Sequence, residues 1–224
     1  MSRIGPFRLV VFDCDGTLVD SQHAIHGCMA ATFREHGLAE PSPAAVRGVI
    51  GLNLGVAIAQ LGGGSATESL TERYRRLFQA WRARGDLPEP LYPGAVETIA
   101  ELAGAGVLLG VATGKSRRGL RGVLERHDLG RHFVTLQTSD DAPGKPHPAM
   151  LQQAMDQAGV APEETAMVGD SRYDMAMARA AGSAAIGVDW GYQAADALRA
   201  EGAHLVVADY AGLLPALRGF AWGA

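Results

Sequence analysis

The chain contains few cysteines and no long apolar run, and each shortage excludes a class of protein. Its two cysteines, Cys14 and Cys28, cannot form a framework of several disulfides, and their spacing matches no metal-binding motif. No apolar run is long enough to cross a bilayer, and the N-terminal segment lacks the apolar region of a signal peptide. We therefore expect a cytoplasmic protein that has no membrane partner.

An excess of positive charge is also missing. The 224 residues carry a net charge of −4, and acidic and basic residues are interspersed along the chain. A nucleic acid would require a clustered basic face, so we expect none as a partner. Hydrophobic residues make up 47% of the chain and charged residues 20%, which is typical of a globular protein rather than a disordered one. The composition predicts no particular oligomeric state.

Short apolar runs alternate with helix-length segments over most of the chain. Runs typical of buried strands lie at residues 8–12, 107–112, 133–137, 165–168, 184–188 and 205–207. Helical spacing of apolar residues, ending at or near a glycine in most cases, is found at residues 93–105, 116–127, 148–158 and 171–181. This alternation predicts an α/β fold with a doubly wound parallel sheet.

Residues 21–84 interrupt the alternation, because they contain helical patterns but no strand. Asp20 or Ser21 is positioned to cap a first helix, and residues 67–84 have the apolar spacing of another. A proline-rich linker at residues 87–94 then returns to the sheet. We interpret the segment as an all-helical cap domain inserted after the first strand. The predicted boundaries are residues 1–19 and 88–224 for the core and residues 20–87 for the cap.

Polar and charged side chains follow four of the predicted strands. Ligands of doubly wound sheets bind at the carboxyl ends of the strands, so these side chains are expected to meet at one edge. In strand order they are Asp13 with Asp15, Thr113, Lys145, and Asp170 with Asp174.

Each of these residue types has a function in phosphoryl transfer, which depends on positioning and charge stabilisation. Crowded carboxylates favour a hard cation, and Mg²⁺ binds one or two carboxylates together with water and phosphate. Asp13 is the expected nucleophile, and Asp15 is the expected general acid and base. Thr113 and Lys145 are expected to hold the oxygens of the transferring phosphoryl group.

The same residues resemble the motifs of the haloacid dehalogenase superfamily. Residues 13–20 (DCDGTLVD) resemble motif one, and Thr113, Lys145 and residues 169–174 resemble motifs two to four in the same order. The resemblance covers essentially the whole chain and is greatest to the phosphoglycolate phosphatase-like branch. It implies a Rossmann-like core with a C1-type cap, and a Mg²⁺-dependent phosphatase that acts on a small phosphorylated metabolite through an aspartyl-phosphate.

Roles for individual residues follow from the resemblance. It implies that the side chains of Asp13 and Asp170 bind Mg²⁺ together with the main-chain carbonyl of Asp15. Asp174 would act at the same metal site from outside the direct ligands of the ion, or would orient Lys145.

Substrate binding is assigned to core and cap residues together. In the core, Thr113, Gly114 and Lys145 are the predicted contacts. In the cap, the resemblance implies that loops choose the substrate, and Arg47 and Asn53 lie in a glycine-rich stretch where a bend between helices is expected.

Several alternatives share these motifs. A pyrophosphatase or a phosphomutase resembling β-phosphoglucomutase would use the same core, although the histidine that such mutases carry would fall near Ile25, between His23 and His26. The carboxylate of Asp15 disfavours a dehalogenase, because the dehalogenases of the superfamily lack one at this position. A receiver-like signalling module also uses a phospho-accepting aspartate, but it has no large cap.

Lysine is rare in this chain, since only Lys115 and Lys145 occur among 20 basic residues. A GC-rich genome accounts for such a bias without a physical cause, but both lysines lie in predicted loops beside the site. Residues 110–116 (GVATGKS) are similar to a P-loop whose leading glycine comes one residue too late. We interpret them as the motif of Thr113, and we expect Lys115 to line the mouth of the site or to be solvated.

Overall fold

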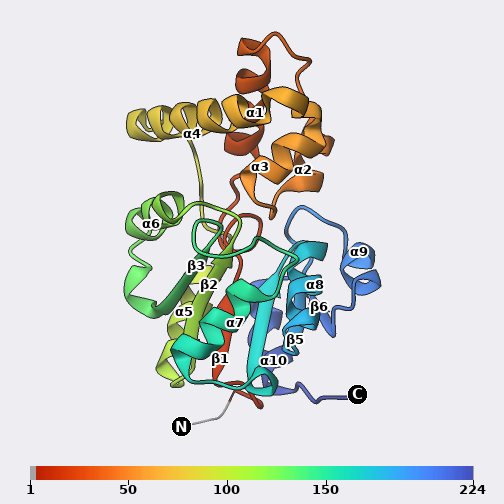
Figure 1. Cartoon of the computed structure of the whole chain (residues 1–224). Helices are drawn as coiled ribbons and strands as arrows, with labels where there is room; N and C mark the ends of the chain where they lie inside the picture. The colour runs from red at the N-terminus through yellow and green to blue at the C-terminus, as the bar shows by residue number, and fades with distance from the viewer. Residues whose placement is uncertain (1–3, 224) are drawn as a thin grey trace.

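A computed structural model describes residues 4–223 and confirms the predicted α/β fold (Figure 1). Six strands form one parallel sheet in the order β3-β2-β1-β4-β5-β6. Residues 1–3 and 224, at the ends of the predicted core, lie outside the described residues. The strands are β1 (Leu9–Phe12), β2 (Leu108–Thr113), β3 (Phe133–Thr138), β4 (Thr165–Gly169), β5 (Ala184–Val188) and β6 (Leu205–Val207).

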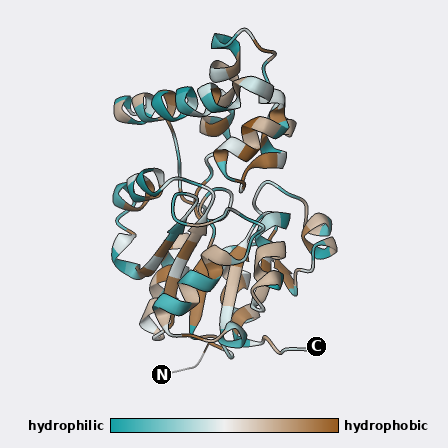
Figure 2. Cartoon of the chain, in the orientation of Figure 1, coloured by the Kyte–Doolittle hydropathy of each residue, from teal (hydrophilic) through white to brown (hydrophobic). Residues whose placement is uncertain are grey.

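Helices cover both faces of the sheet, and Figure 2 shows that its strands are mainly hydrophobic. Val10 and Phe12 face one apolar cluster, and Leu9 and Val11 face the other. The first cluster is covered by α5 (Ala95–Gly104), α6 (Arg117–Arg126) and α10 (Tyr210–Arg218), and the second by α7 (Ala149–Ala158), α8 (Arg172–Ala180) and α9 (Ala195–Ala200). Short helical turns are η3 (Gly130–His132) and η4 (Pro162–Glu164).

Four helices between β1 and β2 pack around an apolar cluster of their own, which includes Met29, Phe33, Ile58 and Leu70. We call this part of the chain the helical insert. Figure 1 shows it above the carboxyl ends of the strands. Its elements are α1 (Gln22–Glu35), α2 (Pro43–Val49), α3 (Leu54–Ile58), the turns η1 (Ala59–Gly63) and η2 (Gly64–Ala66), and α4 (Thr67–Arg84).

The two connections between insert and sheet run side by side. Val19, on the outgoing connection, forms isolated bridges with Asp15 and with Leu91 of the returning connection. A second contact is made by the loop after α2, because the carbonyl oxygens of Gly51 and Leu52 face Gly114 closely enough to exclude a Cβ there. These are two of the places at which the insert is held against the core. Among residues 4–223, no helix has the length and apolar character needed to cross a bilayer.

The strand order reverses between β1 and β4, which is where doubly wound sheets bind their ligands. Phe12 is in register with Val168, and the amide of Asp13 donates to the carbonyl of Val168 at 2.9 Å. The residues that follow β1 and β4 therefore leave the sheet at the same level.

Candidate active site

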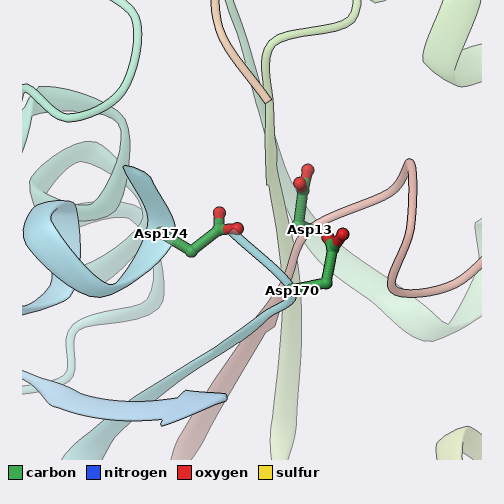
Figure 3. A group of neighbouring side chains, drawn as sticks. All are labelled: Asp13, Asp170 and Asp174. Carbon is green, nitrogen blue, oxygen red and sulfur yellow. The ribbon is translucent and has the colours of Figure 1, made fainter. Parts of the chain in front are cut away.

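Three carboxylates meet at this edge of the sheet. Asp13 follows β1, Asp170 follows β4, and Asp174 lies in the first turn of α8. One oxygen from each lies within 4.8 Å of the others, and Figure 3 shows Asp174 reaching from its helix toward the other two. The sequence-based expectation that aspartates from the first and fourth strands lie close together agrees with this geometry.

Lys145 lies among these carboxylates. Its ammonium is 2.8 Å from Asp13 Oδ1 and 2.5 Å from Asp174 Oδ1, and its side chain is fully buried. Burial alone would lower the pKa of Lys145, but the carboxylates of Asp13 and Asp174 outweigh this effect and the pKa is raised. The lysine is therefore held in its charged form.

One ammonium does not balance three buried carboxylates. Burial raises the pKa of Asp13 to about 7, with Lys145 opposing the shift and repulsion from Asp174 adding to it. Burial, together with repulsion from Asp174 and Asp13, also raises the pKa of Asp170 well above its ordinary value. Additional positive charge at this position would stabilise the ionised carboxylates.

The donor set suits a divalent cation. Asp13 Oδ2 is buried, and among the described residues it has no hydrogen-bond partner. Mg²⁺ is usually bound through one or two carboxylates and keeps several water molecules, and this group of carboxylates can supply those ligands. The residues present thus fit the Mg²⁺ that the sequence predicts.

Local structure explains why Asp174 faces the site. Ser171 and Asp174 form a capping box at the start of α8, in which the Ser171 amide and hydroxyl donate to Asp174 Oδ2 at 3.0 and 2.6 Å. This leaves Asp174 Oδ1 to contact Lys145. Asp174 therefore accepts hydrogen bonds through Oδ2 and forms an ion pair with Lys145 through Oδ1, which makes no hydrogen bond among the described residues.

Asp170 is fixed by two hydrogen bonds and by a close glycine. Thr17 Oγ1 donates to Asp170 Oδ1 at 3.1 Å, and the Tyr192 amide donates to Oδ2 at 2.9 Å. Gly16 has a φ of +84°, and a Cβ at that position would overlap the Asp170 carboxylate. The glycine of the DCDGT motif is therefore required both by the backbone conformation and by the close approach of Asp170.

Asp15 lies outside the group of three carboxylates and has partners of its own. The Ser21 hydroxyl donates to Asp15 Oδ1 at 2.5 Å, and the Lys115 ammonium is 2.9 Å from the same oxygen. Ser21 is the N-cap residue of α1, as expected, but its side chain makes no capping bond because it is directed to Asp15. Of the two positions expected for Lys115, the structure shows the first, because its side chain is only 9% exposed and lines the cavity described below.

Glu89 completes this second group of charges and was not identified from the sequence. It is 2% exposed, it accepts hydrogen bonds from Arg82 of α4 at 2.6 and 2.7 Å, and its Oε1 is 3.4 Å from Lys115. The sequence feature that could have indicated Glu89 is its position between Pro88 and Pro90. A charged side chain is not needed to form a proline-rich linker, so it suggests a contact elsewhere.

A cavity of about 930 Å³ lies between the insert and the sheet edge. Its core lining includes Asp13, Asp15, Thr113, Gly114 and Lys115. From the insert, mainly apolar side chains face it, among them Ile25, Met29, Ile50, Leu52, Tyr74 and Phe78. Cavities of this size hold ligands of metabolite size and larger.

The predicted substrate-binding residues are distributed unequally around this cavity. Thr113 and Gly114 line it, and Lys145 lies behind Asp13. Arg47 is exposed on α2, where the neighbouring Val46 and Val49 face the cavity instead. Asn53 caps α3 by accepting from the Gly55 amide at 2.9 Å, and it is not among the lining residues. Arg47 therefore does not line the cavity, whereas Asn53 lies directly beside Gly144, the residue before Lys145, without lining the cavity.

Comparison with known proteins agrees with this geometry. Residues 10–188 match the family model of the haloacid dehalogenase-like hydrolases. The chain is 36% identical over 203 residues to the Dickeya dadantii protein named "Probable phosphatase IndB", which covers 89% of this chain and 88% of that protein. It is 34% identical over 214 residues to a phosphoglycolate phosphatase of Pseudomonas putida, with coverage of 93% and 79%.

A solved structure with the same fold is a haloacid dehalogenase-like family hydrolase from Streptococcus pneumoniae. It superposes with a TM-score of 0.84 at 24% identity, over 94% of this chain and 98% of that one. The family match covers both ends of the site, from β1 with Asp13 to β5 beyond Asp174. The chain therefore belongs to the haloacid dehalogenase-like hydrolase family, among its phosphatases.

Proposed function

We propose that this protein is a Mg²⁺-dependent phosphatase that hydrolyses small phosphomonoesters through an aspartyl-phosphate on Asp13. The observation that carries the proposal is the environment of Asp13 at the end of β1. Its carboxylate lines the cavity, contacts Lys145 through Oδ1 and keeps Oδ2 free of protein partners among the described residues. A carboxylate fixed by one oxygen and free at the other is arranged for nucleophilic attack.

The chain's residues divide the reaction into two displacements. In the first, an oxygen of Asp13 forms a bond to phosphorus, and the bond from phosphorus to the alcohol oxygen breaks as Asp15 gives that oxygen a proton. In the second, water attacks phosphorus and gives a proton to Asp15, and phosphate leaves Asp13. Lys145 and Thr113 would hold the phosphoryl oxygens during both steps.

Asp13 and Asp170, with the main-chain carbonyl of Asp15, would hold Mg²⁺. When bound, the ion supplies positive charge that reduces repulsion between the Asp13 carboxylate and the phosphate oxygens. Asp174 would orient Lys145, because both of its oxygens already contact Ser171 and Lys145.

The insert would act as the cap that selects the alcohol part of the substrate, with core and cap divided at residues 19–20 and 87–88. Relatives named phosphoglycolate phosphatases make 2-phosphoglycolate the first compound to test. The cavity also admits larger esters. A phosphomutase gains no support, because Ile25 faces the cavity where a histidine would be expected, and neither His23 nor His26 lines it.

The proposal is tested by measuring phosphate release from a panel of phosphomonoesters and pyrophosphate, with Mg²⁺ and with EDTA. We expect Mg²⁺-dependent turnover of at least one monoester, and acid-quenched enzyme should contain phosphate on the peptide that includes Asp13. Asp13→Asn should abolish turnover, whereas Asp128→Asn, at an exposed surface carboxylate, should not change it. Full activity of Asp13→Asn would contradict the proposal.

A further inference from the structure

Lys115 has a set of contacts that the proposed reaction does not yet use. Its ammonium is shared between Asp15 Oδ1 at 2.9 Å and Glu89 Oε1 at 3.4 Å, and it lies 5.4 Å from the centre of the Phe78 ring. Burial alone would lower the pKa of Lys115, but Asp15 and Glu89 outweigh burial and keep it charged.

Both contacts to the Asp15 side chain fall on the same oxygen. The Ser21 hydroxyl and the Lys115 ammonium meet at Oδ1, and among the described residues no hydrogen bond reaches Oδ2. Asp15 itself lines the cavity. The carboxyl group is thus fixed through one oxygen, and the other remains available to a ligand.

Glu89 holds Lys115 from the opposite side and is itself firmly placed. Arg82 binds both Glu89 oxygens and also donates to the Gly119 carbonyl at 3.0 Å, and His127 contacts the Glu89 carbonyl at 2.8 Å. Arg82 belongs to α4, Gly119 belongs to α6, and His127 directly follows α6. Lys115 is therefore anchored independently of Asp15, as a positioning residue must be.

A purely stabilising role accounts poorly for this arrangement. Buried ion pairs contribute little net stability, because the desolvation of both partners offsets their attraction. Among residues 4–223, the one cavity-facing carboxylate that Lys115 contacts is that of Asp15, the proposed general acid.

We propose that Lys115, anchored by Glu89, is a positioning residue that works with Ser21 to fix Asp15 Oδ1 and thereby directs Oδ2 at the leaving oxygen of the substrate. The inference rests on the proposed function, in which Asp15 gives a proton to the alcohol oxygen as the phosphorus–oxygen bond breaks. Loss of Lys115 would then weaken proton donation without removing the nucleophile.

Two esters of similar shape separate this role from others. Phenyl phosphate has a poor leaving group that requires protonation, whereas p-nitrophenyl phosphate has a good one that does not. General acid catalysis is worth about 10²- to 10⁴-fold, so Lys115→Met should lower kcat/KM for phenyl phosphate by about 10- to 100-fold and for p-nitrophenyl phosphate by less than about 3-fold. Asp15→Asn should show the same pattern with a larger loss.

Three further variants keep the test independent of folding defects. Ser21→Ala should also lower kcat/KM more for phenyl phosphate than for p-nitrophenyl phosphate, but by a smaller factor than Lys115→Met. Lys115→Arg should keep most of the wild-type kcat/KM for phenyl phosphate. Arg8→Met, which removes an exposed arginine paired with Glu164 at 3.1 Å, should treat both esters as the wild-type does.

An equal loss of kcat/KM on both esters in Lys115→Met would overturn the inference, as would a rise of KM alone, which would assign Lys115 to substrate binding. In either case an active wild-type enzyme leaves the proposed function standing. A wild-type enzyme that hydrolyses no monoester with Mg²⁺ would overturn both.

Discussion

Replacing the proposed nucleophile with its neutral isostere should make the metal-free protein more stable. Burial raises the pKa of Asp13 from 3.8 to about 7, so ionising this group costs the folded state about 4 kcal/mol relative to the unfolded chain. Below pH 3.8 the group is protonated in both states and the cost is absent. The cost grows as the pH rises from about 4 to about 7, and it is complete above that range.

Asp13→Asn avoids this cost while keeping the shape of the side chain. Its carbonyl oxygen can still accept the Cys14 amide hydrogen bond, which is 2.6 Å long in the wild-type protein. Lys145 keeps its contact with Asp174. In EDTA at pH 8, we expect the free energy of unfolding to rise by about 2–4 kcal/mol, which corresponds to an increase in Tm of roughly 4–16 °C for a chain of this size.

The assay is thermal unfolding of both proteins in EDTA between pH 4 and pH 8.5. The difference in Tm should grow with pH through the range 4 to 7, and Mg²⁺ at pH 8 should narrow it, because the ion stabilises the wild-type protein. Asp196→Asn, at a carboxylate that is 97% exposed, should show no such dependence. An Asp13→Asn variant that is less stable than the wild-type in EDTA at pH 8, or a difference that does not change with pH, would refute the reasoning.

Further substitutions test the geometry around the site. Gly16→Ala should displace the Asp170 carboxylate, so calorimetry should detect no Mg²⁺ binding although the protein folds; wild-type affinity would contradict the close approach. Gly114→Ala should push away the loop at Leu52, which should raise KM and increase the rate of limited proteolysis near residues 87–94. Unchanged values of both would show that this contact does not hold the insert against the sheet edge. Leu70→Ala should lower the free energy of unfolding by about 2–5 kcal/mol in chemical denaturation, because Leu70 is fully buried in the insert.

The sheet and its catalytic edge were predictable because their signals are local. The strands β1, β2 and β4 beneath the site are short, mainly apolar runs that end at or just before a polar residue, and ligand sites at the carboxyl ends of such strands bring Asp13 and Asp170 to one place. In the core, two helices escaped prediction: α9 has only six residues, and α10 contains Pro215, which normally marks the end of a helix.

The contacts of the insert were not predictable in the same way. Glu89 and Lys115 are 26 residues apart, and their contact depends on how the whole insert seats on the sheet. Arg47 and Val46 are neighbours in sequence, yet only Val46 lines the cavity, because successive side chains of an α-helix point in different directions. A polar residue in a glycine-rich stretch indicates a functional loop, but the direction of its side chain follows from tertiary packing.

The separate apolar clusters of the insert and the sheet have an evolutionary consequence. Side chains such as Ile50 and Phe78 line the cavity from a body whose packing, around Met29 and Leu70, is distinct from that beneath Asp13. A substitution at Ile50 or Phe78 therefore reshapes the roof of the cavity without repacking the apolar cluster beneath Asp13. Natural selection can therefore alter the part of the cavity that the insert lines while the strands that carry Asp13 and Asp170 are inherited unchanged.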